Sequence, residues 1–173
     1  KIGHYIPVNI VLKESSVTTP VRMIADTLMS GLNSCLAKGE PQLNNLLDIN
    51  IQFIFGESAF AADFSKMYNN VWVEESDWRY QRVLWHPNAD PSKEPVEYVI
   101  KCLMYGMVHA GNAAESALHL AAERCPQYPL GKAAIENQTY MDDTSKSCTT
   151  SEEARKTAEQ IRLIGESISM PQK

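Results

Sequence analysis

The sequence predicts an α+β fold in which an antiparallel sheet carries helices packed on one face. Strand-like and helix-like segments follow one another without the regular strand–helix–strand order of a parallel sheet. The helix-like segments each show one apolar side, as expected of helices that cover a sheet. The chain has 173 residues, of which 44% are apolar and 21% charged, and this suits one domain with a real core.

The first part of the chain predicts a two-stranded arm followed by a helix. Residues 5–12 and 21–26 have strand patterns, and the polar segment 13–20 between them is rich in turn-forming residues. Residues 41–55 have helical spacing, with Pro41 suited to the first turn. The apolar residues of this helix that we expect to be buried are Leu43, Leu46, Leu47, Ile51 and Ile54.

The middle of the chain predicts mainly strands. Residues 58–64 form a short apolar run that ends in an aspartate, which predicts a buried strand, and residues 65–72 predict one or two helical turns. Residues 78–86 and 96–105 predict two further strands, joined by a proline-rich loop.

The last third predicts two helices on either side of a hairpin. Residues 113–125 form a helix pattern that Pro126 ends. A polar stretch then leads to a hairpin at residues 140–143. Thr150, with Glu153 three residues later, forms a capping box that opens a helix through about Ile168. The residues expected on one side of this helix are Ala154, Ala158, Ile161 and Ile168.

Composition limits the class of protein. The four cysteines are far apart and form no CxxC pair, so we interpret them as reduced thiols of an intracellular protein. No apolar run reaches the roughly 18–20 residues that span a bilayer, so no membrane contact is expected. The net charge of −5 counts mildly against nucleic-acid binding. Because the chain begins with Lys1 and not with methionine, we expect it to be a piece of a longer protein.

Three aspartates are the main candidates for chemistry. Asp63 follows an apolar run, where an unpaired carboxylate is costly, and Asp142 and Asp143 are adjacent. Taken singly, an aspartate at the position of Asp63 is more commonly a cap at a strand end, and a pair such as Asp142 and Asp143 is usually a solvated turn. If the three converged, their repulsion would require cations, and Mg²⁺ prefers carboxylate oxygens. Two such ions are what an in-line displacement at phosphorus needs.

The motifs resemble those of reverse transcriptases. The segment YMDD (140–143) resembles their metal-binding hairpin, and AFAADFSKMYNNVWV (59–73) resembles their first carboxylate motif. The resemblance extends to the BEL/Pao class of LTR retrotransposons. It rests there on four further segments, which are residues 5–26, 31–49, 77–85 and 103–111. It covers nearly the whole chain, with the motifs in the order of that family. It implies a right-hand polymerase fold, fingers-like over about residues 1–57 and palm-like over about 58–173.

The resemblance assigns roles to the aspartates and their neighbours. Asp63, Asp142 and Asp143 would be catalytic and would hold two Mg²⁺ ions, with Mn²⁺ as a possible substitute, and the backbone of Phe64 would complete one metal shell. Tyr68 would lie beneath the incoming sugar, where its ring would collide with a 2′-hydroxyl. The plainer reading of Tyr68 is a core aromatic.

Other implied contacts lie elsewhere in the chain. Arg22, and less strongly Lys13, would bind the triphosphate, since a guanidinium suits phosphate oxygens. Gly106 would lie against the template–primer and the new base pair, and Tyr105 and Met141 would line the same pocket. For the arginine and lysine the ordinary alternative is a solvated face, and for Tyr105 and Met141 it is the core.

The implied function is therefore RNA-directed DNA polymerisation, in the cytoplasm or in virus-like particles. Its partners would be an RNA or DNA template–primer, deoxynucleoside triphosphates, and the thumb, RNase H and integrase parts of a polyprotein. A second hypothesis is an inactive reverse-transcriptase-like domain kept as a binding or scaffold module. It is favoured by the polar flanks of the hairpin, 137–139 and 144–146, and by Gly111, which stands where that family has proline.

Overall fold

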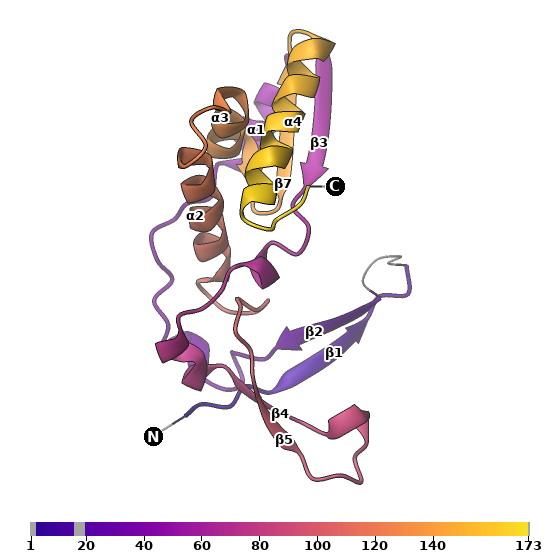
Figure 1. The fold of residues 1–173 in the computed structure, drawn as a ribbon, viewed down its shortest axis with the longest axis vertical. Coiled ribbons are helices and arrows are strands. Elements are labelled where there is room, and N and C mark those ends of the chain that lie inside the picture. Colours follow the sequence, from indigo (N-terminus) through magenta and orange to yellow (C-terminus); the bar gives the residue numbers. More distant parts are fainter. Residues whose placement is uncertain (1–2, 16–19, 173) are drawn as a thin grey trace. The chain divides into compact units, whose positions relative to one another are not determined.

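The computed structural model describes residues 3–15 and 20–172 and divides into two compact units (Figure 1). We call Lys1–Lys38 with Val71–Ala110 the hairpin unit, and Gly39–Asn70 with Gly111–Lys173 the aspartate unit. Each unit is therefore built from two separate stretches of chain. The units change after Lys38, Asn70 and Ala110. The fingers-like and palm-like parts implied by the resemblance, which meet near residue 57, are a different kind of division.

The hairpin unit contains two antiparallel strand pairs. Strand β1 (Val8–Leu12) pairs with β2 (Val21–Ala25), and β4 (Arg82–Trp85) pairs with β5 (Val96–Val99). Both predicted pairs are confirmed, but the second is shorter than predicted: Glu75–Tyr80 forms a 3-10 helix, and β5 ends at Val99. Residues 16–19 of the predicted turn lie outside the described residues. Further short 3-10 helices of the chain are Leu32–Ser34, Tyr68–Asn70 and Pro87–Ala89.

The aspartate unit is built around a three-stranded antiparallel sheet. Its strand order is β3 (Ser58–Asp63), β7 (Asp143–Cys148) and β6 (Thr139–Tyr140). Helix α4 (Ser151–Ser167) packs on β3 and β7, and α3 (Pro129–Gln138) packs on α4 and β7. Thr150 caps α4 by accepting a hydrogen bond from the Glu153 N–H, as its motif predicts. The predicted mixture of helices with an antiparallel sheet is confirmed.

The core of this unit lies between its helices and the sheet. Helix α2 (Ala110–Glu123) starts three residues earlier than predicted, and its Leu118 is fully buried. Helices α3 and α4 approach each other closely at Gly131, where an added Cβ would lie 2.7 Å from the Cβ of Gln160. The Gly131 N–H donates to the Gln160 side chain over 3.0 Å. A glycine is needed there because a larger residue would displace α4.

The predicted helix over 41–55 is only partly correct. Helix α1 spans Leu46–Ile54, and the Asn45 side chain caps it, so Pro41 lies outside the helix. Leu47 is 65% exposed and Ile54 is 76% exposed, whereas Ile49 is buried. The prediction of which face of this helix is buried is therefore wrong. Strand β3 is also less buried than predicted, because its side chains are half-buried or exposed.

Helix α3 was not predicted, since its sequence was interpreted as a polar stretch. Pro129 occupies its first turn, and the α3 residues Ala134 and Ile135 are fully buried. Asn137 and Gln138 therefore end a helix and are not part of a strand. Their polarity does not weaken the hairpin that follows.

Two threonines form a buried polar pair at the base of that hairpin. Thr139 on β6 lies opposite Thr144 on β7, and both are 0% exposed. Their hydroxyl oxygens are 2.9 Å apart and share a hydrogen bond. Each hydroxyl therefore satisfies the other in a site that water does not reach.

We expect Thr139→Val and Thr144→Val each to lower the free energy of unfolding by about 1–3 kcal/mol, because each breaks the buried hydroxyl pair. Thr139→Val leaves the Thr144 hydroxyl without this partner, and Thr144→Val leaves the Thr139 hydroxyl only its long bond of 3.5 Å to the Ala134 carbonyl oxygen. The double variant replaces both hydroxyls by groups of similar shape, and it should be less destabilised than the sum of the two single variants. Urea unfolding of the four proteins measures this coupling. Additive losses would contradict the paired arrangement.

Candidate metal centre

The strand register brings the first aspartate against the hairpin. Strand β3 ends at Asp63 and β7 begins at Asp143, and these two residues are direct antiparallel partners. One residue further on, the Phe64 N–H donates to the Asp142 carbonyl oxygen over 2.8 Å. Phe64 is 1% exposed, so its ring anchors this end of the strand in the core. Pairing and anchoring together fix where the three carboxylates lie.

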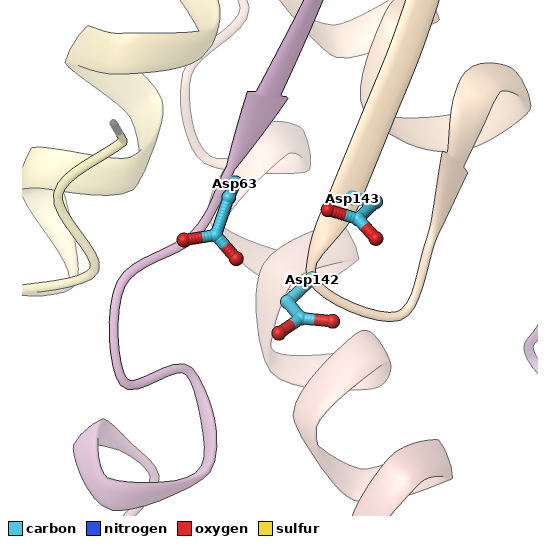
Figure 2. A group of neighbouring side chains, drawn as sticks. All are labelled: Asp63, Asp142 and Asp143. Atoms are coloured by element: carbon cyan, nitrogen blue, oxygen red, sulfur yellow. The ribbon is translucent and has the colours of Figure 1, made fainter. Parts of the chain in front are cut away.

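The three carboxylates converge at one point (Figure 2). Each of Asp63, Asp142 and Asp143 offers an oxygen that lies within 4.8 Å of those of the other two. Asp63 and Asp142 are half-buried, and Asp143 is exposed. The predicted side-by-side placement of Asp63 and the 140–143 hairpin is thus present in the structure.

This convergence carries an electrostatic cost. Burial raises the pKa of the Asp142 carboxyl, its own backbone N–H lowers it, and the nearby charges of Asp143 and Asp63 raise it further. Two carboxylates at this separation repel by about 1 kcal/mol in water and about 4 kcal/mol at an effective dielectric near 20. The arrangement is unfavourable without positive charge close by.

The donor set suits a hard divalent cation. Three carboxylates that face one another from a strand end and a turn provide the all-oxygen environment that Mg²⁺ and Mn²⁺ prefer. No histidine or cysteine belongs to the group, which argues against zinc. A bound cation would convert the repulsion at Asp142 into attraction. The residues therefore fit the ions that the sequence motifs imply.

The turn that carries Asp142 has a strained backbone. Tyr140 and Asp143 are paired, so Met141 and Asp142 form a two-residue hairpin turn. Met141 has φ = +57°, in the left-handed region that glycine or asparagine usually occupies. Such a conformation costs on the order of 1–2 kcal/mol for a residue with a Cβ. Its surroundings must therefore hold the turn in place.

A fourth acidic residue, Glu115, lies beside this turn and was not singled out from the sequence. It is on α2 and is 0% exposed. Burial raises the pKa of its carboxyl to about 7, and the backbone N–H of Met141 partly offsets this rise. One pattern could have revealed it, since Glu115, Leu118 and Ala122 are spaced as one buried helix stripe.

Four of the predicted contacts belong to the hairpin unit. Arg22 is on β2 and Lys13 directly follows β1. Both are exposed, and both lie at the end of the β1–β2 hairpin that is next to its turn. Tyr105 is 47% exposed. Gly106 has φ = +101°, and an added Cβ would lie 2.5 Å from the Ala25 carbonyl oxygen. The glycine is thus required by the packing of its own unit, whatever else it contacts.

Tyr68 belongs to the aspartate unit, at the start of a 3-10 turn, and is half-buried. Its hydroxyl would lie 3.9 Å from a Cβ placed on Gly111, in the first turn of α2. Helix α2 begins at Ala110, so its first turn forms with a glycine at position 111. The glycine that departs from the resembled motif is therefore accommodated without distortion of α2.

Comparisons with known proteins support the fold. No family model matches the chain, and no curated protein matches it. Among solved structures, the chain resembles a foamy viral protease–reverse transcriptase in complex with double-stranded DNA. The TM-score is 0.71 and the sequence identity 16%, over 95% of this chain and 25% of that one. The chain thus spans a quarter of that protein's length. At this identity the likeness establishes the fold alone, which is reverse-transcriptase-like and of the fingers–palm kind.

Among the described residues, no helix combines the length and the apolar character needed to cross a bilayer.

The buried carboxyl of Glu115 gives a testable pH dependence. Because its pKa rises from 4.5 to about 7 on folding, the folded state binds the extra proton between these values, and stability falls as pH rises through that window. We expect the free energy of unfolding of the unmutated protein to fall by up to about 3 kcal/mol between pH 4.5 and 7, and we expect Glu115→Gln not to show this fall. Urea unfolding at several pH values measures the difference between the two proteins.

The matched control is Glu123→Gln, which makes the same change at an exposed position of α2. In this variant the free energy of unfolding should change with pH as steeply as it does in the unmutated protein. A Glu115→Gln variant with that same slope would mean that Glu115 is already ionised in the folded state at low pH.

Proposed function

We propose that the chain is the fingers–palm part of an RNA-directed DNA polymerase that adds deoxynucleotides to a primer 3′ end. The observation that carries the proposal is the convergence of Asp63, Asp142 and Asp143 at the end of β3 and the β6–β7 turn. Such a cluster has a clear use in nucleotidyl transfer. The reverse-transcriptase-like fold supports the same reaction class.

Each aspartate would act as a metal ligand, and the backbone carbonyl of Phe64 would add a further oxygen. When bound, two Mg²⁺ ions supply activation of the attacking hydroxyl and stabilisation of the leaving pyrophosphate. The residues of the chain keep the three carboxylates in register for this purpose. Mn²⁺ has similar ligand preferences and would replace Mg²⁺.

The distribution of charge supports a cation-dependent centre. The hairpin unit carries eight acidic and eight basic residues, whereas the aspartate unit carries thirteen acidic and eight basic residues. The whole excess negative charge of the chain thus lies in the unit that holds the cluster. Two divalent cations would offset most of it. The net charge of −5 therefore weighs less against nucleic-acid binding than it does when read from composition alone.

Arg22 and Lys13 would bind the triphosphate of the incoming nucleotide, and Tyr68 would exclude ribonucleotides. Gly106, Tyr105 and Met141 would contact the new base pair and the template–primer. The foamy viral neighbour is in complex with double-stranded DNA, which supports a duplex of RNA or DNA as the partner here. On its motifs we assign the chain to a BEL/Pao-type retrotransposon polyprotein with thumb, RNase H and integrase parts, acting in the cytoplasm or in virus-like particles.

We expect Asp142→Asn to leave the metal-free protein as stable as before or more stable, because it removes one of three converging charges worth about 1–4 kcal/mol of repulsion. It should abolish nucleotide incorporation, since it removes a metal ligand. Added Mg²⁺ should raise the melting temperature of the unmutated protein more than that of the variant. Melting curves with and without Mg²⁺, and primer extension, measure these effects.

Asp48→Asn is the matched control, since Asp48 is an exposed aspartate on α1 outside the cluster. It should keep the full Mg²⁺ response. Equal Mg²⁺ shifts in the unmutated protein and in Asp142→Asn would show that Asp142 and Asp143 form only a surface turn. The inactive binding module would then be the better description.

Replacing Tyr68 by alanine should admit ribonucleotides, because the ring that would collide with a 2′-hydroxyl is removed. Primer extension with ribonucleotides and deoxynucleotides measures the discrimination. Tyr68→Phe keeps the ring and should keep the selectivity. If Tyr68→Ala discriminates as before and mainly loses about 3–5 kcal/mol of stability, Tyr68 is a packing residue alone.

A further inference from the structure

We propose that Asn33 and Thr27 are positioning residues that lock the backbone of segment 105–108 as a preformed contact surface for the template–primer duplex. That this segment meets the duplex rests on the proposed function. The lock itself does not, because it consists of hydrogen bonds within the hairpin unit.

The carbonyl oxygen of Gly106 lies at the centre of the lock. It accepts a hydrogen bond from the Thr27 hydroxyl over 2.5 Å and another from the Asn33 amide nitrogen over 2.8 Å. Both donors are distant in sequence, 79 and 73 residues from Gly106. A carbonyl oxygen has two lone pairs, so both of its acceptor sites are used. Rotation of this peptide group would break two bonds at once.

The Asn33 side chain holds the segment at a second point. Its amide oxygen accepts from the Val108 N–H over 2.9 Å, while its amide nitrogen donates to Gly106. One planar side chain thus pairs with a carbonyl and an N–H that are two residues apart. This requires an amide, because an aspartate carboxylate has no donor and a leucine has neither a donor nor an acceptor.

The two locking residues are themselves fixed. Thr27 is buried, and its carbonyl oxygen accepts from the backbone N–H of Asn33 over 3.2 Å. Asn33 belongs to the 3-10 helix Leu32–Ser34, and Leu32 is buried. A closed ring of hydrogen bonds therefore joins Thr27, Asn33 and Gly106. Such a satisfied polar network makes the local backbone rigid.

The locked segment presents side chains to solvent. Tyr105 is 47% exposed and Val108 is 37% exposed, whereas Met104 and Met107 are buried. The two methionines anchor the segment, and its fixed backbone determines where the two exposed side chains lie. A surface that is rigid before association loses less conformational entropy when a partner binds. Segment 105–108 is therefore suited to binding as well as to connecting the elements beside it.

The charge of the hairpin unit is compatible with a polyanionic partner. This unit carries eight acidic and eight basic residues, whereas the aspartate unit carries thirteen acidic and eight basic residues. Repulsion of phosphate groups by net charge is therefore weaker at the unit that holds segment 105–108.

The test compares variants that remove the bonds of the lock with variants that keep them. Thr27→Val has a similar shape and no hydroxyl, and Thr27→Ser keeps the hydroxyl. Asn33→Leu removes both amide bonds, and Asn33→Asp keeps the acceptor for the Val108 N–H. The control is Asn9→Leu, at an exposed position of β1 in the same unit.

Three measurements are made at a temperature where each variant is folded. Hydrogen exchange of the Val108 amide, followed by NMR, reports the lock. The shifts of the amide resonances of segment 105–108 on addition of a DNA duplex with a 5′ overhang report the contact. Fluorescence anisotropy of the same duplex, carrying a dye, reports its affinity.

We expect Asn33→Leu to speed exchange of the Val108 amide about tenfold, which corresponds to the loss of one net hydrogen bond. Asn33→Leu and Thr27→Val should weaken duplex binding about 10–100-fold, the effect of displacing a contact surface by about 1 Å. Thr27→Ser should keep the affinity. Asn33→Asp should keep the slow exchange and lose affinity, because it no longer donates to Gly106. Asn9→Leu should change neither.

Unchanged duplex affinity in Asn33→Leu and Thr27→Val would overturn the proposal. A faster Val108 exchange in the same Asn33→Leu protein would then show that the bonds support only the fold. Amide resonances of segment 105–108 that stay unshifted with bound duplex would overturn it as well. If Asn33→Leu does not fold, the comparison of Thr27→Val with Thr27→Ser decides.

Failure of the proposed function gives a different result. The unmutated protein then binds the duplex but extends no primer with Mg²⁺, and the affinities of the variants still decide the role of Asn33 and Thr27. An unmutated protein that binds no duplex overturns both proposals.

Discussion

The pairing of β3 with β7 is the interaction on which the candidate site depends. It runs from Ser58 opposite Cys148 to Asp63 opposite Asp143, so the two carboxylates meet at the last rung of the ladder. Like charges placed directly opposite each other weaken a sheet. The preceding rungs and the packing of α4 must therefore outweigh this repulsion. A slip of one residue would send the side chains of one strand to the other face and separate the cluster.

The same register explains what the sequence could and could not predict. The three aspartates were identifiable because Asp142 and Asp143 are adjacent and Asp63 ends a strand pattern. The sequence did not identify the packed face of α1, because Leu47 and Ile54 belong to an apolar helical stripe that is exposed in the structure. Periodicity shows that a helix has an apolar side, but not whether anything covers it.

The missed features have a related physical origin. Helix α3 contains Gly131, a residue with poor helix propensity, and the close crossing with α4 compensates for it. Glu115 was passed over because a glutamate is assumed to be solvated, although its spacing places it on a buried stripe. In both cases a tertiary contact overrides the preference of the residue type, and one sequence alone does not contain that contact.

The polar flanks of the hairpin illustrate how such contacts change an interpretation. Thr139 and Thr144 pair with each other, and Lys146 donates to Gln138, which in turn donates to Gln52 on α1. Side chains that contribute little to an apolar strand thus form two separate sets of hydrogen bonds. A satisfied polar network specifies one geometry more narrowly than apolar packing does, because each bond requires direction as well as distance. For a turn that must hold two carboxylates beside a third, this restriction is useful, and the polar flanks are consistent with a working site.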